Sequence, residues 1–572
     1  MPEDPGDLDC SLRFVLSPFL PYWHTLRWLK PVQLWGRAWF RLHRPRPDTR
    51  PAPPLRPARG AWLACRRAPS MTGPARFRFL SVEHELAAPA DWDRADWPRL
   101  WRYNLHYFDD LAAQDAADRV SRHCALIERW IADNPPGRGT GWEPYPVSLR
   151  IVNWIKWGLA DGGGPGVEQA RLSPAAVHSL AVQARWLRQR LEIHLLGNHL
   201  WANAKALVFA GVFFDDAEAS GWREKGLALL RRELREQILP DGGHFERSPM
   251  YHATLLEDLL DLLQLGDRYA GSIPASDLDA WRETAGRMLR WLRVMTHPDG
   301  GIAFFNDAAF EVAPDLAALE DYAASACGFS SAEDSPLADA SLVHPSPVTA
   351  ASPDSGYAIV ALPDSGYVRL HAGPAVLIAD VGAIGPDYLP GHAHADTLAF
   401  ELSLHGRRAI VNSGTSTYEA DAERLRQRGT AAHSTVVVDD ADSSEVWSSF
   451  RVARRARPMN VEWGTDPDGT LWLRAAHDGY LRLPGRVVHR REWRLTAQGL
   501  RIVDRLDGRP RSAQARFHLH PAVEPADVGA DLTALRVEAS TWHPQFGVAV
   551  GNRVLVADFA GRDTVETTFR WP

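Results

Sequence analysis

The spacing of the apolar residues changes once along this chain of 572 residues. Between about residues 96 and 330, apolar side chains recur every three or four positions, which places them on one face of an α-helix. One such stripe consists of Val177, Leu180, Ala184, Leu187, Leu191 and Leu195. After Ser331 to Ser355 the period becomes two, as in a β-strand, and the alternating apolar residues include Leu398, Phe400, Leu402 and Leu404. The pattern predicts a helical part followed by a β part.

Breaks in this pattern predict three units. Residues 1–95 form an N-terminal extension that contains a Pro-rich linker at residues 45–57. Residues 96–340 form the helical domain and residues 341–572 the β domain, because the stretch from Ser331 to Ser355 has the composition of a loop. The expected fold class is α+β and multidomain. Paired helices closed into an (α/α) toroid are one architecture for the first part, and an antiparallel β-sandwich is expected for the second.

The segment from Leu12 to Leu42 is unusual because it mixes tryptophans with basic residues. Prolines at positions 18, 21 and 31 prevent one long helix. Two interpretations remain open: an anchor on a membrane surface, or a cover packed on the next domain. The whole chain carries 64 basic and 71 acidic side chains, a net charge of −7, which argues against binding nucleic acid in bulk. A locally basic cleft for an acidic partner is still compatible with that charge.

Four local clusters contain residues that could carry chemistry. The first runs from Gly197 to Asn203 at a junction of two predicted helices and offers Asn198 and His199, which could simply cap a helix. The second places Tyr251 in the first turn of a helix opened by Ser248-Pro249. A helix N-terminus favours nearby negative charge, so a tyrosinate is expected to cost less there. A core tyrosine with a satisfied hydroxyl is the alternative.

The other two clusters lie in the β part. His392 and His394 belong to a His-Ala-His-Ala-Asp run just before a predicted strand, and an extended backbone would place both on one side. Two such histidines could bind a metal or share catalytic work. His433 precedes another strand, and together with His394 and Asn412 it could complete a three-ligand site. His433 could equally bond to nearby backbone.

Taken together, these clusters resemble the heparinase II/III family of lyases. The resemblance extends from about Leu100 to Val452 and includes two further stretches, Trp101 to Phe108 and Trp142 to Trp154. It implies an incomplete (α/α) toroid followed by an antiparallel β-sandwich. It also implies cleavage of an acidic, uronate-containing polysaccharide by β-elimination, giving 4,5-unsaturated products and needing no organic cofactor.

The resemblance also implies roles for individual residues. Asn198, with His199 beside it, corresponds to the group that neutralises the substrate carboxylate. Tyr251 corresponds to the proton-transfer tyrosine and His392 to the catalytic histidine of the β domain. His394 and His433 correspond to ligands of a structural zinc ion, although this chain has Asn412 where zinc-binding members usually carry Asp.

The chemistry explains these residue types. The C5 proton of a uronic acid becomes removable when the adjacent carboxylate is neutralised, and a base and an acid then act at C5 and at the C4 oxygen. Whether one tyrosine does both, or histidine is the base and tyrosine the acid, is left open. Four further residues are expected to line the cleft or, alternatively, to pack: Arg150, Asn153, Glu246 and Arg247.

Three rival functions are compatible with the sequence. A uronyl C5-epimerase would use the same proton abstraction. An inverting glycoside hydrolase would need a pair of carboxyl groups, for which Glu143 and Glu246 are the candidates. A non-catalytic glycan-binding protein of exopolysaccharide assembly is the third.

Several properties stay open at this point. The polymer could be a glycosaminoglycan, an alginate-like chain or a bacterial exopolysaccharide. The sequence has no apolar run long enough to span a membrane and no evident signal peptide. We therefore expect a protein of the bacterial cytoplasm or periphery, with its export route unknown.

Overall fold

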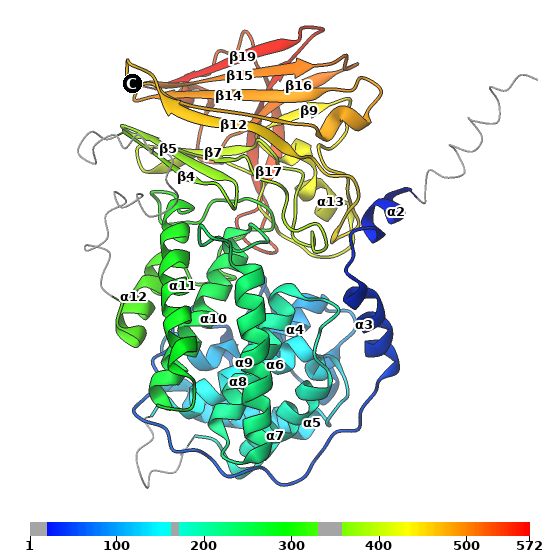
Figure 1. Ribbon diagram of the computed structural model, residues 1–572, viewed down its shortest axis with the longest axis vertical. Helices are drawn as coiled ribbons and strands as arrows, with labels where there is room; N and C mark the ends of the chain where they lie inside the picture. Colours follow the sequence, from blue (N-terminus) through cyan, green and yellow to red (C-terminus); the bar gives the residue numbers. More distant parts are fainter. Residues whose placement is uncertain (1–19, 162–170, 330–356, 572) are drawn as a thin grey trace, which may run out of the picture.

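The computed structural model describes residues 20–161, 171–329 and 357–571. Its helical part and its sheet-rich part are stacked end to end (Figure 1). This arrangement confirms the predicted fold class, a helical toroid followed by antiparallel sheets. The predicted domain boundary at residues 340–341 lies outside the described residues. None of the described helices combines the length and the apolar character that crossing a bilayer requires.

The helices begin at sequence signals of the expected kind. Ser173, Asp216, Ser248 and Asp315 each cap a helix by accepting a hydrogen bond from the backbone three residues later. The α-helices are α2 (Leu20–Leu26), α3 (Pro31–Leu42), α4 (Arg99–Tyr107), α5 (Val120–Asp133), α6 (Pro144–Gly158), α7 (Pro174–Gln189), α8 (Gly197–Phe213), α9 (Ala217–Gln237), α10 (Pro249–Arg268), α11 (Ala275–Val294), α12 (Leu316–Cys327) and α13 (Ala422–Arg428).

Helix α8 is the centre of the helical part. Every residue of this helix except His199 is buried. It packs against α6, α7, α9 and α10. Two glycines let α8 and α9 approach closely, because a Cβ at Gly211 would lie 2.3 Å from the backbone nitrogen of Arg223, and one at Gly226 would lie 2.7 Å from the carbonyl oxygen of Ala204. The body of α8 is therefore held in place by close packing against α9.

The strands pair antiparallel throughout. Two sheets have five strands, in the orders β4-β5-β6-β7-β8 and β12-β13-β14-β15-β19; a third has four strands in the order β17-β18-β16-β9. The strands are β1 (Met71–Gly73), β2 (Arg76–Phe79), β3 (Val82–Glu85), β4 (Tyr357–Leu362), β5 (Tyr367–Ala372), β6 (Ala375–Asp380), β7 (Phe400–Leu404), β8 (Arg407–Ile410), β9 (Val436–Val438), β10 (Val446–Trp447), β11 (Arg451–Val452), β12 (Pro458–Thr465), β13 (Leu471–His477), β14 (Val488–Thr496), β15 (Gly499–Asp507), β16 (Ala513–His518), β17 (Arg536–Trp542), β18 (Val550–Asp558) and β19 (Thr564–Arg570).

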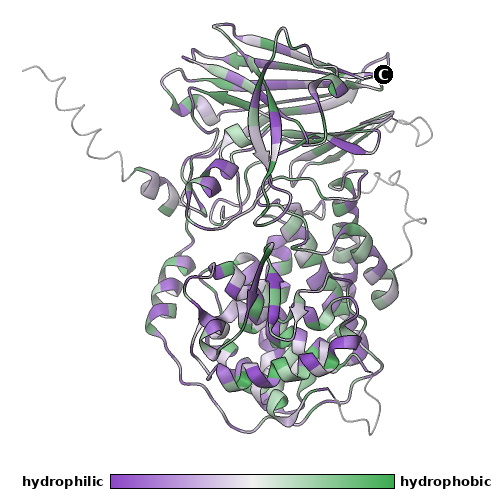
Figure 2. Ribbon diagram, turned by 180° about the vertical axis from the view of Figure 1, so that it is seen from behind, coloured by the Kyte–Doolittle hydropathy of each residue, from purple (hydrophilic) through white to green (hydrophobic). Residues whose placement is uncertain are grey.

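The β4–β8 sheet joins the two parts of the molecule. On β6, Leu377 belongs to the core of the stacked sheets, whereas the adjacent Ile378 packs in a cluster with Trp291 and Met295 of the helical part. Successive residues of a strand point to opposite faces, so β6 is buried at every position. Figure 2 shows apolar and polar residues interspersed along the helices and strands of both parts. The helical and β parts therefore share an apolar contact that fixes the loops between them.

Candidate functional site

A large cleft lies where the helical part meets the loops of the β part. Its volume is about 2150 Å³, and its lining includes Asn198, His199, Tyr251 and His392. Pockets for drug-sized ligands are commonly about 300–1,000 Å³. The cleft therefore has room for a chain of several sugar rings.

The first turn of α8 presents Asn198 and His199 to this cleft. Leu196 and Gly197 have φ values of 62° and 54°, so the chain turns sharply into the helix. A Cβ at position 197 would lie 2.9 Å from Oε1 of Glu246 and 2.6 Å from a methyl group of Leu389. Glycine is required at this position because a loop of the β part and the carboxylate of Glu246 both approach it closely.

His199 carries an acidic neighbour. Its Nδ1 lies 3.2 Å from Oε2 of Glu192, and its ring lies against that of Tyr145 with the centroids 4.4 Å apart. Burial disfavours the imidazolium, but the charges of Glu192 and Glu246 outweigh it, and the pKa of His199 is raised. The start of α8 thus offers a neutral amide donor beside an imidazole that tends toward its charged form.

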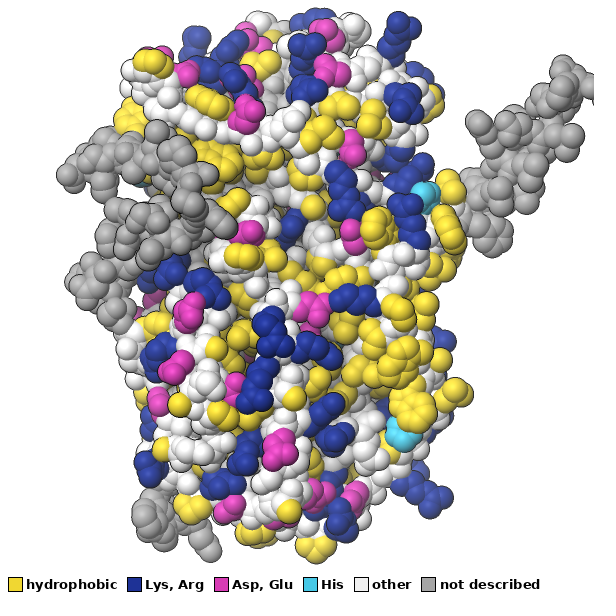
Figure 3. Space-filling model, in the orientation of Figure 1, with side chains coloured by type: hydrophobic (Ala, Val, Ile, Leu, Met, Phe, Trp, Pro, Cys, Tyr) yellow, Lys and Arg dark blue, Asp and Glu magenta, His cyan; other side chains and the backbone are white. Residues whose placement is uncertain are grey.

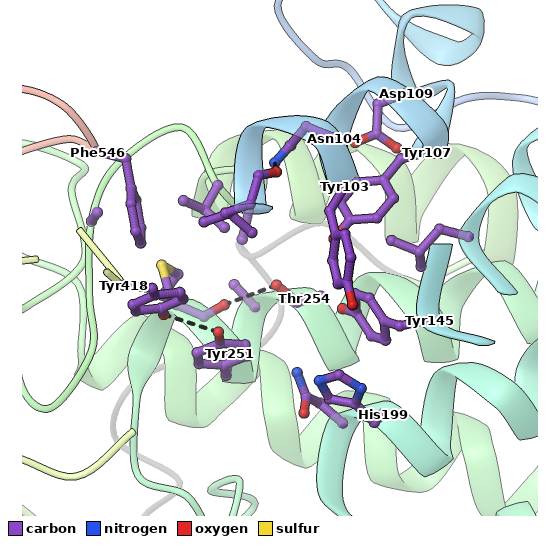
Figure 4. A pocket seen from close by; sticks show the side chains of 18 of the residues that line it. Tyr103, Asn104, Tyr107, Asp109, Tyr145, His199, Tyr251, Thr254, Tyr418 and Phe546 are labelled. Atoms are coloured by element: carbon purple, nitrogen blue, oxygen red, sulfur yellow. Dashed lines mark hydrogen bonds between the residues drawn. The ribbon is translucent and has the colours of Figure 1, made fainter. Parts of the chain in front are cut away.

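Tyr251 and His392 come from different parts of the chain and meet in the cleft. Their ring centroids are 3.9 Å apart. The hydroxyl group of Tyr251 shares a hydrogen bond of 2.9 Å with that of Tyr418, as Figure 4 shows. Burial, followed by the charges of Tyr418 and Asp307, raises the pKa of Tyr251 well above its usual value. The helix start alone therefore does not make Tyr251 a tyrosinate, because burial and the nearby carboxylate of Asp307 favour the neutral phenol.

The orientation of His392 is set by Asp307, which lies between α11 and α12. Nδ1 of His392 is 2.8 Å from Oδ2 of Asp307, and Nε2 of His394 is 2.8 Å from Oδ1. Arg424 of α13 donates to both oxygens of this carboxylate. Burial opposes the charge on Asp307, but Arg424 and the two histidines hold its pKa well below the usual range. Because Nδ1 of His392 donates to a carboxylate, the neutral form of the ring has its lone pair on Nε2.

Glu246 completes the wall of the cleft between α8 and His392. Its Oε2 lies 3.7 Å from Nε2 of His392, and its Oε1 has no hydrogen-bond partner within the described part of the chain. Burial raises the pKa of Glu246, although His392 and His199 act in the opposite direction. One carboxyl group therefore links the two candidate sets, Asn198–His199 and Tyr251–His392.

Aromatic side chains line much of the remaining cleft. Figure 4 shows that these residues come from several elements, among them α4, α6 and α10. The hydroxyl of Tyr103 is bonded to the carboxylate of Glu143, and the ring of Phe546 packs edge-on against that of Tyr418, with the centroids 4.9 Å apart. Flat apolar faces with polar tips suit sugar rings. Aromatic residues along the cleft include Tyr103, Tyr107, Tyr145, Tyr251, Tyr418, Phe450 and Phe546.

A second cluster of buried side chains has the features of a metal site. The rings of His394 and His433 have their centroids 5.3 Å apart. Nδ1 of His394, both ring nitrogens of His433 and Nδ2 of Asn412 have no hydrogen-bond partner among the described residues. Burial lowers the pKa of His394 to about 4 and that of His433 to about 3, so both rings are neutral. Two neighbouring neutral imidazoles that each have a ring nitrogen without a partner fit a metal ion. Within the described ranges no third His, Cys, Asp or Glu joins them, so Asn412 would have to supply the next ligand through its Oδ1, which here accepts a hydrogen bond of 3.3 Å from the backbone of Ser434.

Two models of one known protein family match this chain. A family model described as Heparinase II/III N-terminus matches residues 92–334, and one described as Heparinase II/III-like, C-terminal matches residues 354–564. The chain belongs to the heparinase II/III family. The resemblance predicted from the four sequence clusters is thereby confirmed.

Individual relatives of this family member are distant. FtsZ-localized protein C of Caulobacter vibrioides is 28% identical over 462 residues, which are 75% of this chain and 71% of that protein. Heparin-sulfate lyases of Bacteroides stercoris and Pedobacter heparinus are 25% and 24% identical, over 45% and 59% of this chain. The chain spans only 38% and 50% of those two lyases. A solved structure of heparinase III has a TM-score of 0.61 at 20% identity, covering 84% of this chain and 79% of that one, which shows a shared fold.

Most, but not all, of the residues predicted for the catalytic and substrate-binding site line the cleft. Asn198, His199, Tyr251, His392 and Glu246 line the cleft. Asn153 also lines it, but its amide donates to the carbonyl of Tyr107 and to Asp109, which leaves it a packing function as well.

Two of the four residues expected to line the cleft or to pack, Arg150 and Arg247, have packing contacts in the structure. Arg150 is fully buried, and its guanidinium donates to Gln183 and to the carbonyls of His106 and Gly141. Arg247 donates to the carbonyl of Ala383 and does not line the cleft. A buried guanidinium needs partners for its donors, and nearby backbone carbonyls supply them here instead of a substrate.

Three residues of the site were not predicted from the sequence: Asp307, Tyr418 and Arg424. Their importance depends on contacts across 85 to 167 positions of the chain. One local signal pointed to Asp307, which stands with Asn306 inside the otherwise apolar run from Phe304 to Phe310. A charged residue within such a run requires a buried partner.

Replacing Glu192 tests the electrostatics around His199. Glu192→Gln keeps the size of the side chain but removes its charge, so the pKa of His199 should fall and the ring should lose its proton at a lower pH. An NMR titration of the His199 ring measures this directly. Glu128→Gln, which removes a carboxylate that contacts Ser173 outside the cleft, is the control. An unchanged His199 titration in Glu192→Gln would show that Glu192 does not set its charge.

Proposed function

We propose that this chain is a polysaccharide lyase that cleaves a uronate-containing polymer by β-elimination and leaves a 4,5-unsaturated sugar. One observation carries the proposal: Tyr251 and His392 lie in contact in a cleft whose wall also presents Asn198 and His199. Groups for neutralising a carboxylate and for moving two protons thus line one cleft of oligosaccharide size. The family membership and the lyases among its relatives support the same reaction.

The first requirement of the reaction is to neutralise the carboxylate at C5. The amide of Asn198 would donate a hydrogen bond to it, and the charged form of His199 would add a positive charge. Negative charge that develops on the carboxylate during proton removal would strengthen both interactions. Loss of one such donor commonly lowers kcat by about 10²–10³-fold.

The hydrogen bonds in the cleft favour one assignment of base and acid. Because Nδ1 of His392 donates to Asp307, the neutral ring has its lone pair on Nε2, and in that form His392 would take the proton from C5. Tyr251 retains its proton because its pKa is raised, so it would give that proton to O4 as the C4–O4 bond breaks. The electron pair of the C5–H bond becomes the C4=C5 double bond, and the pair of the C4–O4 bond leaves with the oxygen. Proton transfer from His392 back to Tyr251, directly or through water, restores both groups.

The charges in the cleft favour a weakly charged polymer over a densely sulfated one. Lys205 contacts Asp258 at 2.6 Å and Asp261 at 2.5 Å, and Lys156 contacts Asp261 at 2.9 Å. Other cations of the lining are paired in the same way, Arg67 with Glu257 and Arg99 with Glu143. These cations are already neutralised, so a row of sulfate groups would gain little from them. At these positions a polymer whose only regular charge is the uronate fits best, whereas Arg37, Arg41, Arg190 and Arg451 of the same lining have no acidic partner among the described residues and could each contact a further anionic group.

A non-catalytic, glycan-binding role is the second candidate. It is favoured by the similarity to FtsZ-localized protein C, whose name describes a location and no reaction. Incubation of the protein with a uronate polymer in deuterium oxide distinguishes the lyase, epimerase and binding functions. A lyase produces the unsaturated sugar, which absorbs in the ultraviolet, whereas an epimerase exchanges the C5 proton for solvent deuterium without cleavage. A binding protein does neither and retains the polymer.

Tyr251→Phe tests the proposal most simply. Removal of the hydroxyl takes away the proton for O4, and a general acid contributes roughly 10²–10⁴-fold to the rate. We expect turnover of a non-sulfated uronate polymer to fall by that factor, as measured by ultraviolet absorbance of the product, with an unchanged circular dichroism spectrum. Tyr103→Phe, which removes another phenol from the same cleft, should retain most of the activity.

Two results would contradict this account. Near-normal turnover in Tyr251→Phe would remove the phenol from the mechanism. Absence of unsaturated product from the unmodified protein on every uronate polymer tested, with binding retained, would favour the glycan-binding function.

We also propose that His394, His433 and Asn412 hold one structural zinc ion. A bound zinc ion would cross-link the loop of His394 to the start of β9 and so support the His394–Asp307 hydrogen bond. The expected result is about one zinc per chain by elemental analysis, lost in His433→Ala together with part of the thermal stability. Asn412→Asp adds a negative charge and should bind zinc more tightly in competition with a chelating dye. Equal, negligible zinc binding by all three proteins would disprove the site.

A further inference from the structure

Helix α3 packs by one narrow face on the helical part and on a loop of the β part. Gln33 donates to the carbonyl of Tyr388 at 3.0 Å, and Gly36 lies so close to His194 that a Cβ would be 3.1 Å from the Cβ of His194. The ring of Phe40 packs on His194 and on the guanidinium of Arg190. Positions 33, 36 and 40 follow the spacing of a single helical face. The N-terminal segment is thus partly a cover, as one of the two sequence interpretations proposed.

The opposite face of α3 is apolar and points into solvent. Trp35 and Trp39 are each 54% exposed, Leu34 is 55% exposed and Leu42 is 82% exposed. At 100° per residue, positions 34, 35, 38, 39 and 42 form one stripe directed away from positions 33, 36 and 40. The packing of this helix therefore uses its smaller and more polar face and leaves its most apolar face without a partner in the described structure.

Helix α2 extends the same surface. Trp23 is 65% exposed and Leu26 is 51% exposed. Both helices lie at one edge of the molecule in Figure 1, and Figure 3 shows hydrophobic side chains with Lys and Arg side chains nearby along that edge. Exposed apolar groups that gather in this way mark an interaction site.

The charge around this surface identifies the kind of partner. The chain has a net charge of −7, yet no acidic residue occurs between Asp9 and Asp48. The described residues of this stretch carry only basic charges, at Arg27, Lys30, Arg37, Arg41, Arg44 and Arg46. Lys30 is paired with Glu236, but Arg37, Arg41, Arg44 and Arg46 are exposed. Tryptophan and leucine on one helix face, with arginines at its side, match the interface of an anionic lipid bilayer.

We propose that the outer face of α2 and α3 docks this protein on the surface of an anionic lipid bilayer. The tryptophans and leucines enter the headgroup region, and the arginines contact the lipid phosphates. Arg37, Phe40 and Arg41 also line the mouth of the cleft. Docking through α3 therefore places the cleft beside the membrane, where it meets polymer that is held at that surface.

Vesicle flotation with the full chain tests this proposal. The protein should float with vesicles of phosphatidylcholine mixed with phosphatidylglycerol, and much less with phosphatidylcholine alone. The double variant Trp35→Ser/Trp39→Ser, whose side chains are exposed and outside the core, should bind at least about tenfold more weakly. Trp463→Ser, which removes an exposed tryptophan of β12, is the matched control and should bind as the unmodified protein does.

A charge variant separates the two contributions. Arg41→Gln/Arg44→Gln should weaken binding to the anionic vesicles and reduce its dependence on salt. The proposal is overturned if the protein floats with neither vesicle, if it binds both equally, or if Trp35→Ser/Trp39→Ser binds like the Trp463→Ser control. It is also overturned if sedimentation shows a dimer that the tryptophan variant converts to a monomer, because the surface would then belong to a second copy of the chain.

Discussion

The carboxylate of Asp307 holds the candidate site together. It is fully buried, and it accepts hydrogen bonds from His392, His394 and Arg424, with the hydroxyl of Thr415 at 3.3 Å from Oδ1. The aspartate belongs to the helical part, whereas its partners come from two loops and from helix α13 of the β part. An unpaired charge at this depth would cost several kcal/mol. Separation of the two parts at this point would leave the charge of Asp307 without its partners. The same hydrogen bonds hold His392 against Tyr251.

Burial and charge divide the titratable groups of the cleft into distinct chemical states. Asp307 remains ionised because it has a guanidinium partner, whereas Glu246 and Tyr251 are pushed toward their neutral forms by desolvation. His199 is pushed toward its charged form by Glu192. Groups whose pKa values are separated by their surroundings can take different roles in one reaction. A proton donor, a free imidazole nitrogen and a carboxylate-binding pair thus coexist within one cleft.

Local sequence patterns predicted the two parts of the fold and several residues of the candidate site. The change from a period of three or four to a period of two identified the two parts of the fold, because each period reflects which side chains must face a core. Asn198, Tyr251 and His392 could be found because each stands in a recognisable cluster at the start of a helix or before a strand. Arg150 looked equally suitable, but its position on the inner face of α6 decides its function, and only packing reveals that face.

The contacts that connect these clusters could not be predicted in the same way. Asp307 and Arg424 are 117 positions apart, and Tyr251 and Tyr418 are 167 positions apart. Neither pair follows a period or a motif. The outward direction of Trp35 and Trp39 was hidden for the same reason, because a helical stripe shows that a face is apolar but not what covers it.

A crystal structure of the Tyr251→Phe protein with a bound uronate oligosaccharide tests the central claim most directly. The account predicts that the carboxylate of one sugar accepts a hydrogen bond from the amide of Asn198. It also predicts that C5 of that sugar faces Nε2 of His392 and that its C4 oxygen lies beside residue 251. A sugar bound with its carboxylate directed away from Asn198, or at a place that His392 and residue 251 cannot both reach, would contradict the account.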